Sequence, residues 1–234
     1  MRKTICHYKL KMAPSLLPIY DAANRYEIGV DECARGPMFG RLYVAAVILP
    51  KDDSFRHELM KDSKKIKSKK KMRELSDYIK RDAIAWHIHF IEADVIDEIN
   101  IRQAVFRGMR ECIRRILPDM GRETLLVIDG NDFMPYTVFD EATETLREIP
   151  HVTVEKGDGT YSFIAAASIL AKNAHDDYIL ELCEQHPILK TRYSLHENVG
   201  YGTKKHMEGI KEHGITQWHR KTFGACKTAE YSPV

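Results

Sequence analysis

Residues 28–40, with the sequence IGVDECARGPMFG, constrain the fold of this chain more than any other stretch. Their apolar start is typical of a buried strand, yet the run ends in two acids, Asp31 and Glu32, and a turn with glycine and proline follows. Burying a carboxylate without a partner is costly, so a basic side chain or a metal ion is expected to face these acids. The fold must therefore bring a positive partner to the end of a buried strand.

Hydrophobic periodicity predicts two adjacent strands, followed by helices and strands in alternation. The predicted strands cover residues 26–32, 41–50, 84–93, 124–131 and 152–159. The predicted helices cover residues 69–81, 98–117, 161–185 and 203–214. This order indicates an α/β fold, a mixed sheet flanked by helices, with a C-terminal extension of helix and loop. Alanines 165–167 should let the longest helix lie close to the sheet.

Cysteine usage and hydropathy bear on the cellular compartment. The five cysteines are scattered and form no CxxC pair, which argues against a zinc site or a disulfide framework. No apolar run approaches the ~18 residues of a membrane helix. Lysines and prolines interrupt residues 1–20 where a signal peptide needs an apolar core. We expect a cytoplasmic protein that does not contact a membrane.

The charges of the chain do not by themselves identify what it binds. The formal net charge is +2, but lysines cluster within residues 61–71. Such a cluster could contact a polyanion, although a solvated helix face explains it more simply.

Acids follow three of the predicted strands: Asp31 and Glu32, then Asp129, then Asp158. Ligands of α/β sheets collect beyond strand ends, and four carboxylates gathered there would repel one another unless divalent cations neutralised them. Oxygen ligands suit Mg²⁺ or Mn²⁺ and not Zn²⁺. Two such ions about 4 Å apart would support phosphoryl transfer. Taken singly, an Asp before a Gly is a common turn signal.

Seven motifs resemble those of ribonuclease HII, the type 2 ribonucleases H, and occur in the same order. They are GVDECARGP, DSKK, DEINIRQA, VIDGN, KGD with SFIAAASILAK, GYGTKKH and HRKTF. The resemblance implies a ribonuclease H-like fold. It also implies an endoribonuclease that cuts the RNA strand of RNA:DNA hybrids, and DNA duplexes with embedded ribonucleotides, as in ribonucleotide excision repair. Cleavage by two-metal-ion catalysis would leave 3′-hydroxyl and 5′-phosphate ends.

The family's metal ligands fall on Asp31, Glu32, Asp129 and Asp158, which would bind Mg²⁺ or Mn²⁺. On this basis we divide the chain into an N-terminal extension with little order (residues 1–24), a catalytic core (residues 25–186) and a substrate-binding extension (residues 187–234). We expect the protein to act as a monomer.

The resemblance also implies how the ribose 2′-hydroxyl, which distinguishes RNA from DNA, is detected. The family uses a Gly-Arg-Gly turn and a tyrosine that packs on the neighbouring sugar. Here the turn is Ala34, Arg35 and Gly36, and the tyrosine is Tyr201. If the first position needs a positive φ, alanine is strained and recognition of an isolated ribonucleotide weakens; if φ is negative, Ala34 is harmless.

Basic residues are expected around the scissile phosphates, where they would position the strand without reading its sequence. Those placed nearest are Lys64, Lys156 and Lys172. Others, expected to line the approach of the duplex, are the lysines within 65–71, Lys204, Lys205, Arg220 and Lys221.

A fifth acid, Asp176, is not expected to join the four metal ligands. It shares a helix face with Lys172, about 21 Å from a helix start near Ser162. We therefore interpret it as a structural partner of the lysine.

Three alternatives compete with this interpretation. The sister family, ribonuclease HIII, has a turn that resembles Gly-Thr-Gly and an additional N-terminal domain, so Arg35 argues against it. A junction resolvase or transposase would not be expected to carry both GYGT and the Ala-Arg-Gly turn. A non-catalytic binder of hybrids would gain nothing from four acids that face a polyanion.

Overall fold

The structure, a computed structural model, describes residues 16–117, 123–141 and 143–234. Its main sheet has five strands in the order β3-β2-β1-β4-β7. The central strand β1 (Tyr26–Cys33) pairs antiparallel with β2 (Leu42–Ile48), which pairs antiparallel with β3 (Ala85–Ile91). On its other side lie β4 (Thr124–Asp129) and β7 (His151–Val154), both parallel to it. The predicted mixed sheet is confirmed.

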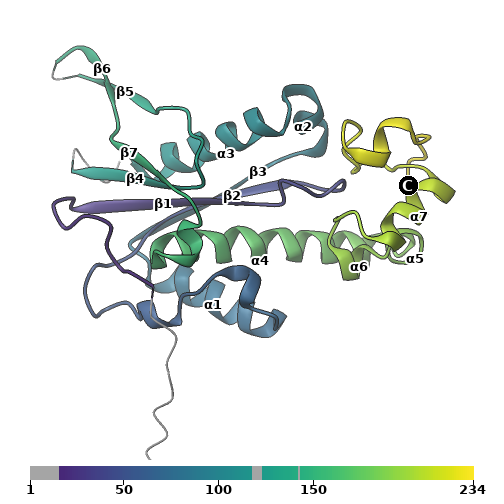
Figure 1. Ribbon diagram of the computed structural model, residues 1–234, viewed down its shortest axis with the longest axis horizontal. Helices are drawn as coiled ribbons and strands as arrows, with labels where there is room; N and C mark the ends of the chain where they lie inside the picture. Colours follow the sequence, from purple (N-terminus) through teal and green to yellow (C-terminus); the bar gives the residue numbers. More distant parts are fainter. Residues whose placement is uncertain (1–15, 118–122, 142) are drawn as a thin grey trace, which may run out of the picture.

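Helices cover both faces of this sheet (Figure 1). On one face α4 (Ser162–Gln185) packs against β1 and β2, and α1 (Lys69–Asp82) packs against α4. On the other face α3 (Ile101–Ile116) packs against β2 and β3, next to α2 (Ala93–Ile99). The predicted flanking helices are therefore present.

The contact between α4 and β1 is unusually close. A Cβ atom placed on Gly29 would lie 2.7 Å from the main-chain carbonyl of Phe163. Alanines 165–167 are fully buried in the same layer. The small side chains thus bring α4 against the strand that ends in Asp31 and Glu32, as the sequence predicts.

Two predicted elements differ from the structure by more than a shift of one or two residues at their ends. The helix predicted over residues 98–117 is interrupted at Asn100, where φ is 65°. With a ψ of 160° Asn100 leaves the helical conformation and ends α2, and the Gln103 amide donates a hydrogen bond of 3.1 Å to its Oδ1, which begins α3. The strand predicted over residues 152–159 ends at Val154, and the 3₁₀ turn η4 (Gly157–Gly159) carries Asp158.

A small hairpin was not predicted from the sequence. Its strands are β5 (Thr137–Asp140) and β6 (Thr145–Glu148), which extend away from the main sheet in Figure 1. Phe139 and Leu146 pair across it and are 61% and 73% exposed. No residue of either strand is fully buried, and their sequences TVFD and TLRE do not alternate between apolar and polar residues, so hydrophobic periodicity does not reveal them.

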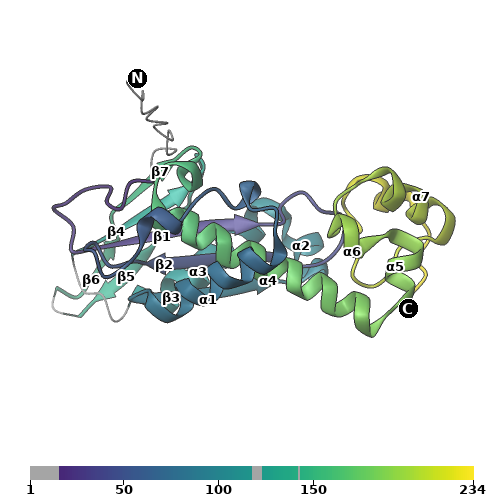
Figure 2. The ribbon, with the colours of Figure 1, turned by 90° about the horizontal axis from the view of Figure 1, so that it is seen from below.

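The C-terminal residues form a third cluster of helices at the far end of α4 (Figures 1 and 2). They contain α5 (Ile188–Tyr193), α6 (Leu195–Asn198), α7 (Lys204–His213) and the 3₁₀ helix η5 (Gly224–Thr228). Their core packs Leu189, Tyr193 and Ile210 against Leu182 of α4. The helix predicted over residues 203–214 is confirmed.

The proposed domain boundaries stay a prediction, and residues 1–15 lie outside the described residues. Leu17 is described, and its amide donates a hydrogen bond of 2.8 Å to the Thr160 carbonyl. Within the described ranges no helix is long and apolar enough to cross a membrane.

Two histidines, His206 and His219, are buried in the C-terminal cluster with their Nε2 atoms 3.2 Å apart. Burial lowers the pKa of His206, and burial together with the neighbouring His206 lowers the pKa of His219 to about 3. In the unfolded chain a histidine titrates near pH 6.5. Since the unfolded state binds these protons first, their contribution to stability is present above about pH 6.5 and is lost as the pH falls toward 3.

We therefore expect His219 to lower the free energy of unfolding by about 1.6 kcal/mol between pH 6.5 and pH 5, and His206 to lower it further. Urea denaturation across this range measures the slope in the wild type and in His219→Gln, which cannot titrate at this position. A slope that is equally steep in both proteins would contradict the prediction.

Candidate active site

Strand register brings the predicted acids to one edge of the sheet. Val30 of β1 aligns with Ile128 of the parallel strand β4, so Asp31 and Asp129 come next on adjacent strands. Asp129 in turn aligns with Val154 of β7, and the η4 turn between β7 and α4 carries Asp158. The main-chain amides of Gly157 and Asp158 donate hydrogen bonds of 2.6 and 3.3 Å to Asp129 Oδ1. This links the second acidic motif directly to the third.

Asp31 lies at the centre of this acidic cluster and is only 4% exposed. Burial raises the pKa of Asp31 well above its usual range, and repulsion from the other three acids raises it further. A hydrogen bond from Ser168 of α4 opposes the shift. The same serine hydroxyl lies 2.9 Å from that of Ser63. Helix α4 therefore holds the first carboxylate of the cluster in place.

Glu32 and Asp129 are also disfavoured as anions. Burial raises the pKa of Glu32, although Arg35 Nη1 lies 3.3 Å from its Oε1 and opposes this. Burial and the charge of Asp158 raise the pKa of Asp129, despite the two amides that bind it. Three mutually repelling, desolvated carboxylates are a costly arrangement that a cation would relieve.

The donor set fits a hard divalent cation. In the part of the chain that the structure describes, no three His, Cys, Asp or Glu side chains converge as a ready-made metal cage. Mg²⁺ is typically held by one or two carboxylates, with waters and substrate phosphates as its other ligands. Asp31 and Asp129, which end adjacent parallel strands, have the oxygen chemistry for such a site. Glu32 and Asp158 flank them as further donors.

The three lysines predicted near the scissile phosphates lie at different places relative to the acids. Lys64, from the 3₁₀ turn η2 (Ser63–Lys65), places its Nζ 3.2 Å from Asp158 Oδ2. Lys156 is exposed directly before η4, in a left-handed conformation with φ of 56°. Lys172 lies one helical turn after Ser168 on α4 and forms an ion pair with Asp176. The first two therefore flank Asp158, and the third lies along α4.

The prediction that Arg220 lines the approach of the duplex is wrong. Its side chain is completely buried, and its guanidinium donates to the main-chain carbonyls of Arg35, Pro37 and Gly40. An arginine within a basic motif is expected at the surface. Only the tertiary fold, which places three carbonyl groups around it, accounts for its burial.

The predicted recognition turn lies next to the acids. Ala34 has a φ of 71°, so the alternative in which alanine is strained is the one that applies. Arg35 is exposed, and Gly36 faces the predicted tyrosine: a Cβ on Gly36 would lie 3.8 Å from Tyr201 Cε1. Tyr201 is 45% exposed. The fold thus brings the turn and the tyrosine together although Gly36 and Tyr201 are 165 positions apart in the sequence.

Asp176 has the partners expected of a structural acid. Lys172 Nζ donates to its Oδ2 at 2.8 Å, and His175 Nδ1 lies 3.1 Å from its Oδ1. Although burial acts in the opposite direction, these contacts hold the pKa of Asp176 below its usual range. The ion pair predicted with Lys172 is present.

Asp176→Asn is accordingly expected to lower the free energy of unfolding by about 1–3 kcal/mol, because a partly buried ion pair is lost. Its cleavage rate should stay within about threefold of the wild type, since Asp176 lies about 21 Å along α4 from the turn with Asp158. Denaturation and cleavage assays on the same preparation check both expectations. A well-folded but inactive variant would contradict this assignment.

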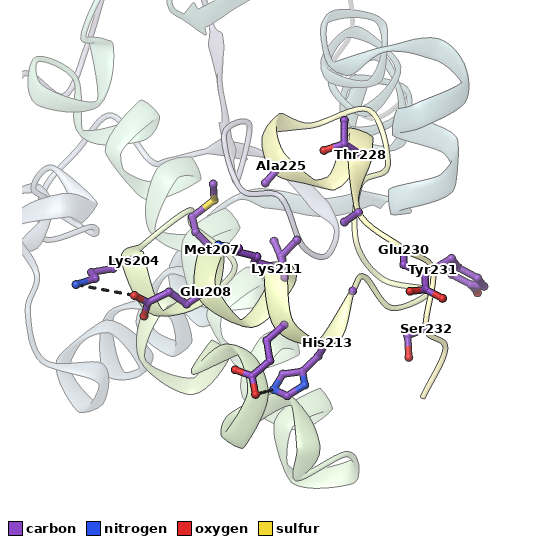
Figure 3. Close-up of a pocket in the computed structure, with 14 residues that line it drawn as sticks. Lys204, Met207, Glu208, Lys211, His213, Ala225, Thr228, Glu230, Tyr231 and Ser232 are labelled. Carbon is purple, nitrogen blue, oxygen red and sulfur yellow. Dashed lines mark ion pairs between the residues drawn. The ribbon is translucent and has the colours of Figure 1, made fainter.

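Among the described residues, a large cavity lies away from the acidic cluster and a small one adjoins it. One of about 730 Å³ lies in the C-terminal cluster, where α7 faces the segment after η5 (Figure 3). Met207, Lys211 and Tyr231 line it, and none of the four acids does. A cavity of about 160 Å³ adjoins Glu32 and Asp129, with Arg35 and Arg102 in its wall. The cavity beside the acids is smaller than the pockets that typically enclose a small-molecule ligand, so it does not indicate an enclosed small-molecule site.

Comparisons with known proteins identify relatives over most of the chain. The family model described as Ribonuclease HII matches residues 28–226. A ribonuclease HII of Parabacteroides distasonis is 45% identical over 208 residues, which are 89% of this chain and 94% of the relative. A ribonuclease HII of Bacteroides thetaiotaomicron is 44% identical over 208 residues, with the same shares.

A solved structure extends the similarity to the fold. The ribonuclease H2 of Pyrococcus horikoshii OT3 aligns with a TM-score of 0.65 at 19% identity, over 86% of this chain and 95% of that chain. At this identity the likeness concerns the fold, and it agrees with the ribonuclease H-like architecture expected from the motifs.

Proposed function

The chain belongs to the ribonuclease HII family and is a type 2 ribonuclease H, a hydrolytic endoribonuclease; from this premise we propose what it cuts and how. The proposed substrates are the RNA strand of RNA:DNA hybrids and DNA duplexes with embedded ribonucleotides. The proposed products have 3′-hydroxyl and 5′-phosphate ends. The observation that carries the proposal is the acidic edge, where burial and mutual repulsion raise the pKa values of Asp31, Glu32 and Asp129.

The proposed mechanism is two-metal-ion hydrolysis. Asp31 and Asp129 would hold the cations, with Glu32 and Asp158 as further ligands. When bound, Mg²⁺ or Mn²⁺ would supply Lewis acidity for the attack of water and for the departure of the 3′-oxygen. The protein contributes the fixed positions of its carboxylates. Ser168 holds Asp31, and two main-chain amides hold Asp129.

Lysines near the acids are proposed to contact phosphates. Lys64 and Lys156 flank Asp158, and Lys172 lies one turn beyond Ser168 on α4. In the substrate complex Lys64 could exchange its carboxylate partner for a phosphate oxygen. Such contacts would position the strand without reading its sequence.

Recognition of the ribonucleotide is assigned to the turn of Ala34, Arg35 and Gly36 and to the ring of Tyr201. Support comes from their proximity: Gly36 faces Tyr201, and Arg35 forms an ion pair with Glu32. A 2′-hydroxyl at the cleavage position could therefore meet the turn while the ring packs on the adjacent sugar. We further propose that the protein acts as a monomer in the cytoplasm, in ribonucleotide excision repair.

Cleavage assays with end-labelled duplexes test the proposal. The protein is incubated with Mg²⁺ or Mn²⁺ and a DNA duplex that contains one ribonucleotide. A continuous RNA:DNA hybrid is tested in parallel. Both should be cut, and ligation and primer extension should detect the 5′-phosphate and the 3′-hydroxyl. An all-DNA duplex and a chelator are the controls. Cutting of the all-DNA duplex, or no cutting of either ribonucleotide substrate, would refute the proposal.

A further inference from the structure

Residues 218–220 connect the two segments that carry the proposed recognition groups. The Arg220 amide donates to the Met38 carbonyl at 2.8 Å, and the Gly40 amide donates to the Trp218 carbonyl at 2.8 Å. The Met38 amide in turn donates to the Gly200 carbonyl at 3.0 Å. A Cβ on Gly200 would lie 2.7 Å from the Phe39 carbonyl oxygen, so these main chains approach closely. The turn and Tyr201 therefore rest on a shared main-chain scaffold.

Arg220 adds side-chain contacts to this scaffold. Its Nε donates to the Gly40 carbonyl at 2.9 Å, and its Nη1 donates to the carbonyls of Pro37 at 2.9 Å and Arg35 at 3.2 Å. Burial lowers the pKa of Arg220 to about 10, so the group is still charged at neutral pH. A buried cation bound by carbonyls is an expensive way to stabilise a core. Its contacts do, however, fix the main chain directly at the recognition turn.

His219 reaches the other recognition segment through His206. The Thr216 amide donates to His219 Nδ1 at 2.9 Å, so this nitrogen must be the acceptor and Nε2 carries the proton of the neutral ring. His219 Nε2 can then donate to His206 Nε2 at 3.2 Å. His206 Nδ1 is left as the donor to the Tyr201 carbonyl at 3.0 Å. With neutral rings, a single set of tautomers satisfies every hydrogen bond in the series from Thr216 through the two histidines to Tyr201.

We propose that the buried neighbours His219 and Arg220 are positioning residues for ribonucleotide recognition. Arg220 fixes the turn of Arg35 and Gly36, and His219 fixes the main chain of Tyr201 through His206. Neither side chain touches the substrate. The inference rests on the proposed recognition role of Tyr201 and adds to it what sets the spacing between the turn and the ring.

The alternative is that these residues merely stabilise the C-terminal cluster. Tyr193→Phe provides a matched control for this. The Tyr193 hydroxyl donates a buried hydrogen bond of 3.1 Å to the Gly214 carbonyl in the same cluster, and its ring packs against both histidines. The phenylalanine keeps the ring and loses the hydrogen bond. Tyr193→Phe thus perturbs stability without breaking the series of hydrogen bonds from Thr216 to Tyr201.

The measured quantity is the rate of cleavage at a single embedded ribonucleotide divided by the rate on a continuous hybrid. Arg220→Lys keeps a positive charge but loses the guanidinium fork, and His219→Leu breaks the histidine chain. Each should lower this ratio about five- to tenfold, as expected for one or two lost buried hydrogen bonds. His219→Gln, which keeps an N–H near the position of Nε2, should restore much of the ratio. Tyr193→Phe should leave the ratio unchanged even if it lowers the melting temperature.

A double variant separates positioning from simple destabilisation. If His219 acts through Tyr201, His219→Leu should not change the ratio further in a Tyr201→Ala background. Equal effects of His219→Leu in both backgrounds would overturn the inference. So would an unchanged ratio in Arg220→Lys, which also serves as the test if His219→Leu does not fold.

Different results would refute the positioning role of His219 and Arg220 and the recognition role of Tyr201. If Tyr201→Ala lowers the ratio but the variants of His219 and Arg220 do not, only the positioning inference is lost. If Tyr201→Ala itself leaves the ratio unchanged, the recognition role of the tyrosine is lost and the inference falls with it. Cleavage of both substrates by the wild type would still support the proposed activity.

Discussion

Asp31→Asn is expected to reduce cleavage at least about a hundredfold at saturating Mg²⁺, because a bound cation contributes several kcal/mol to the transition state and this change removes one of its ligands. Affinity for a hybrid should stay the same or increase, since a negative charge near the phosphates is lost. Single-turnover cleavage and equilibrium binding separate the two effects. Asp129→Asn should behave in the same way.

The structure adds a readout that needs no activity. Burial and three neighbouring carboxylates disfavour the anion of Asp31, so replacing it with a neutral amide should raise the melting temperature of the metal-free protein. Asp132→Asn is the matched control. Asp132 lies three residues after Asp129, is partly exposed and forms an ion pair with Arg102. Replacing Asp132 should change neither the cleavage rate nor the melting temperature much. Retention of more than a tenth of the wild-type rate by Asp31→Asn would refute its role as a metal ligand.

Tyr201→Ala is expected to reduce cleavage at a single embedded ribonucleotide by about five- to a hundredfold, by analogy with the 1–3 kcal/mol of a base–aromatic contact. Cleavage of a long hybrid should fall less. A hybrid offers many registers and many 2′-hydroxyls, whereas a lone ribonucleotide offers one, so a lost sugar contact cannot be recovered by shifting along the duplex. Tyr201→Phe, which keeps the ring, is the control and should retain the discrimination.

Ala34→Gly examines the same recognition site from the turn. At a φ of 71° an alanine is strained by about 1–2 kcal/mol, which glycine would relieve. Loss of the buried methyl group and the greater freedom of glycine in the unfolded chain offset part of this gain. We expect activity at a single ribonucleotide to rise selectively. If both substrates respond equally to Tyr201→Ala, and neither responds to Ala34→Gly, these recognition roles should be abandoned.

The elements that could be predicted from the sequence are those with a strong local signal. The apolar runs of β1 and β4 are buried on both sides, and parallel pairing then brings Asp31 and Asp129 to one edge. The long apolar helix α4 was predictable for the same reason. The hairpin of β5 and β6 was not, because none of the residues in its two strands is buried and their sequence does not alternate between apolar and polar residues.

Features that depend on segments distant in the sequence could not be predicted. Arginine is usually found at the surface, and the burial of Arg220 depends on carbonyl groups about 180 residues earlier in the chain. The link from His219 through His206 to Tyr201 likewise needs the folded C-terminal cluster. The sign of φ at Ala34 was open because the sequence does not determine the conformation of the turn.

Helix α4 connects the turn that carries Asp158 to the C-terminal cluster without interruption. Its 24 residues contain neither glycine nor proline, and its first half is buried against the sheet. A helix of this kind bends only gently, and the contacts of residues 37–40 with residues 200 and 218–220 form a second connection to the same cluster. The conformational entropy of bringing Tyr201 beside the acidic edge is therefore lost when the chain folds. Little of it has to be lost again when a duplex binds.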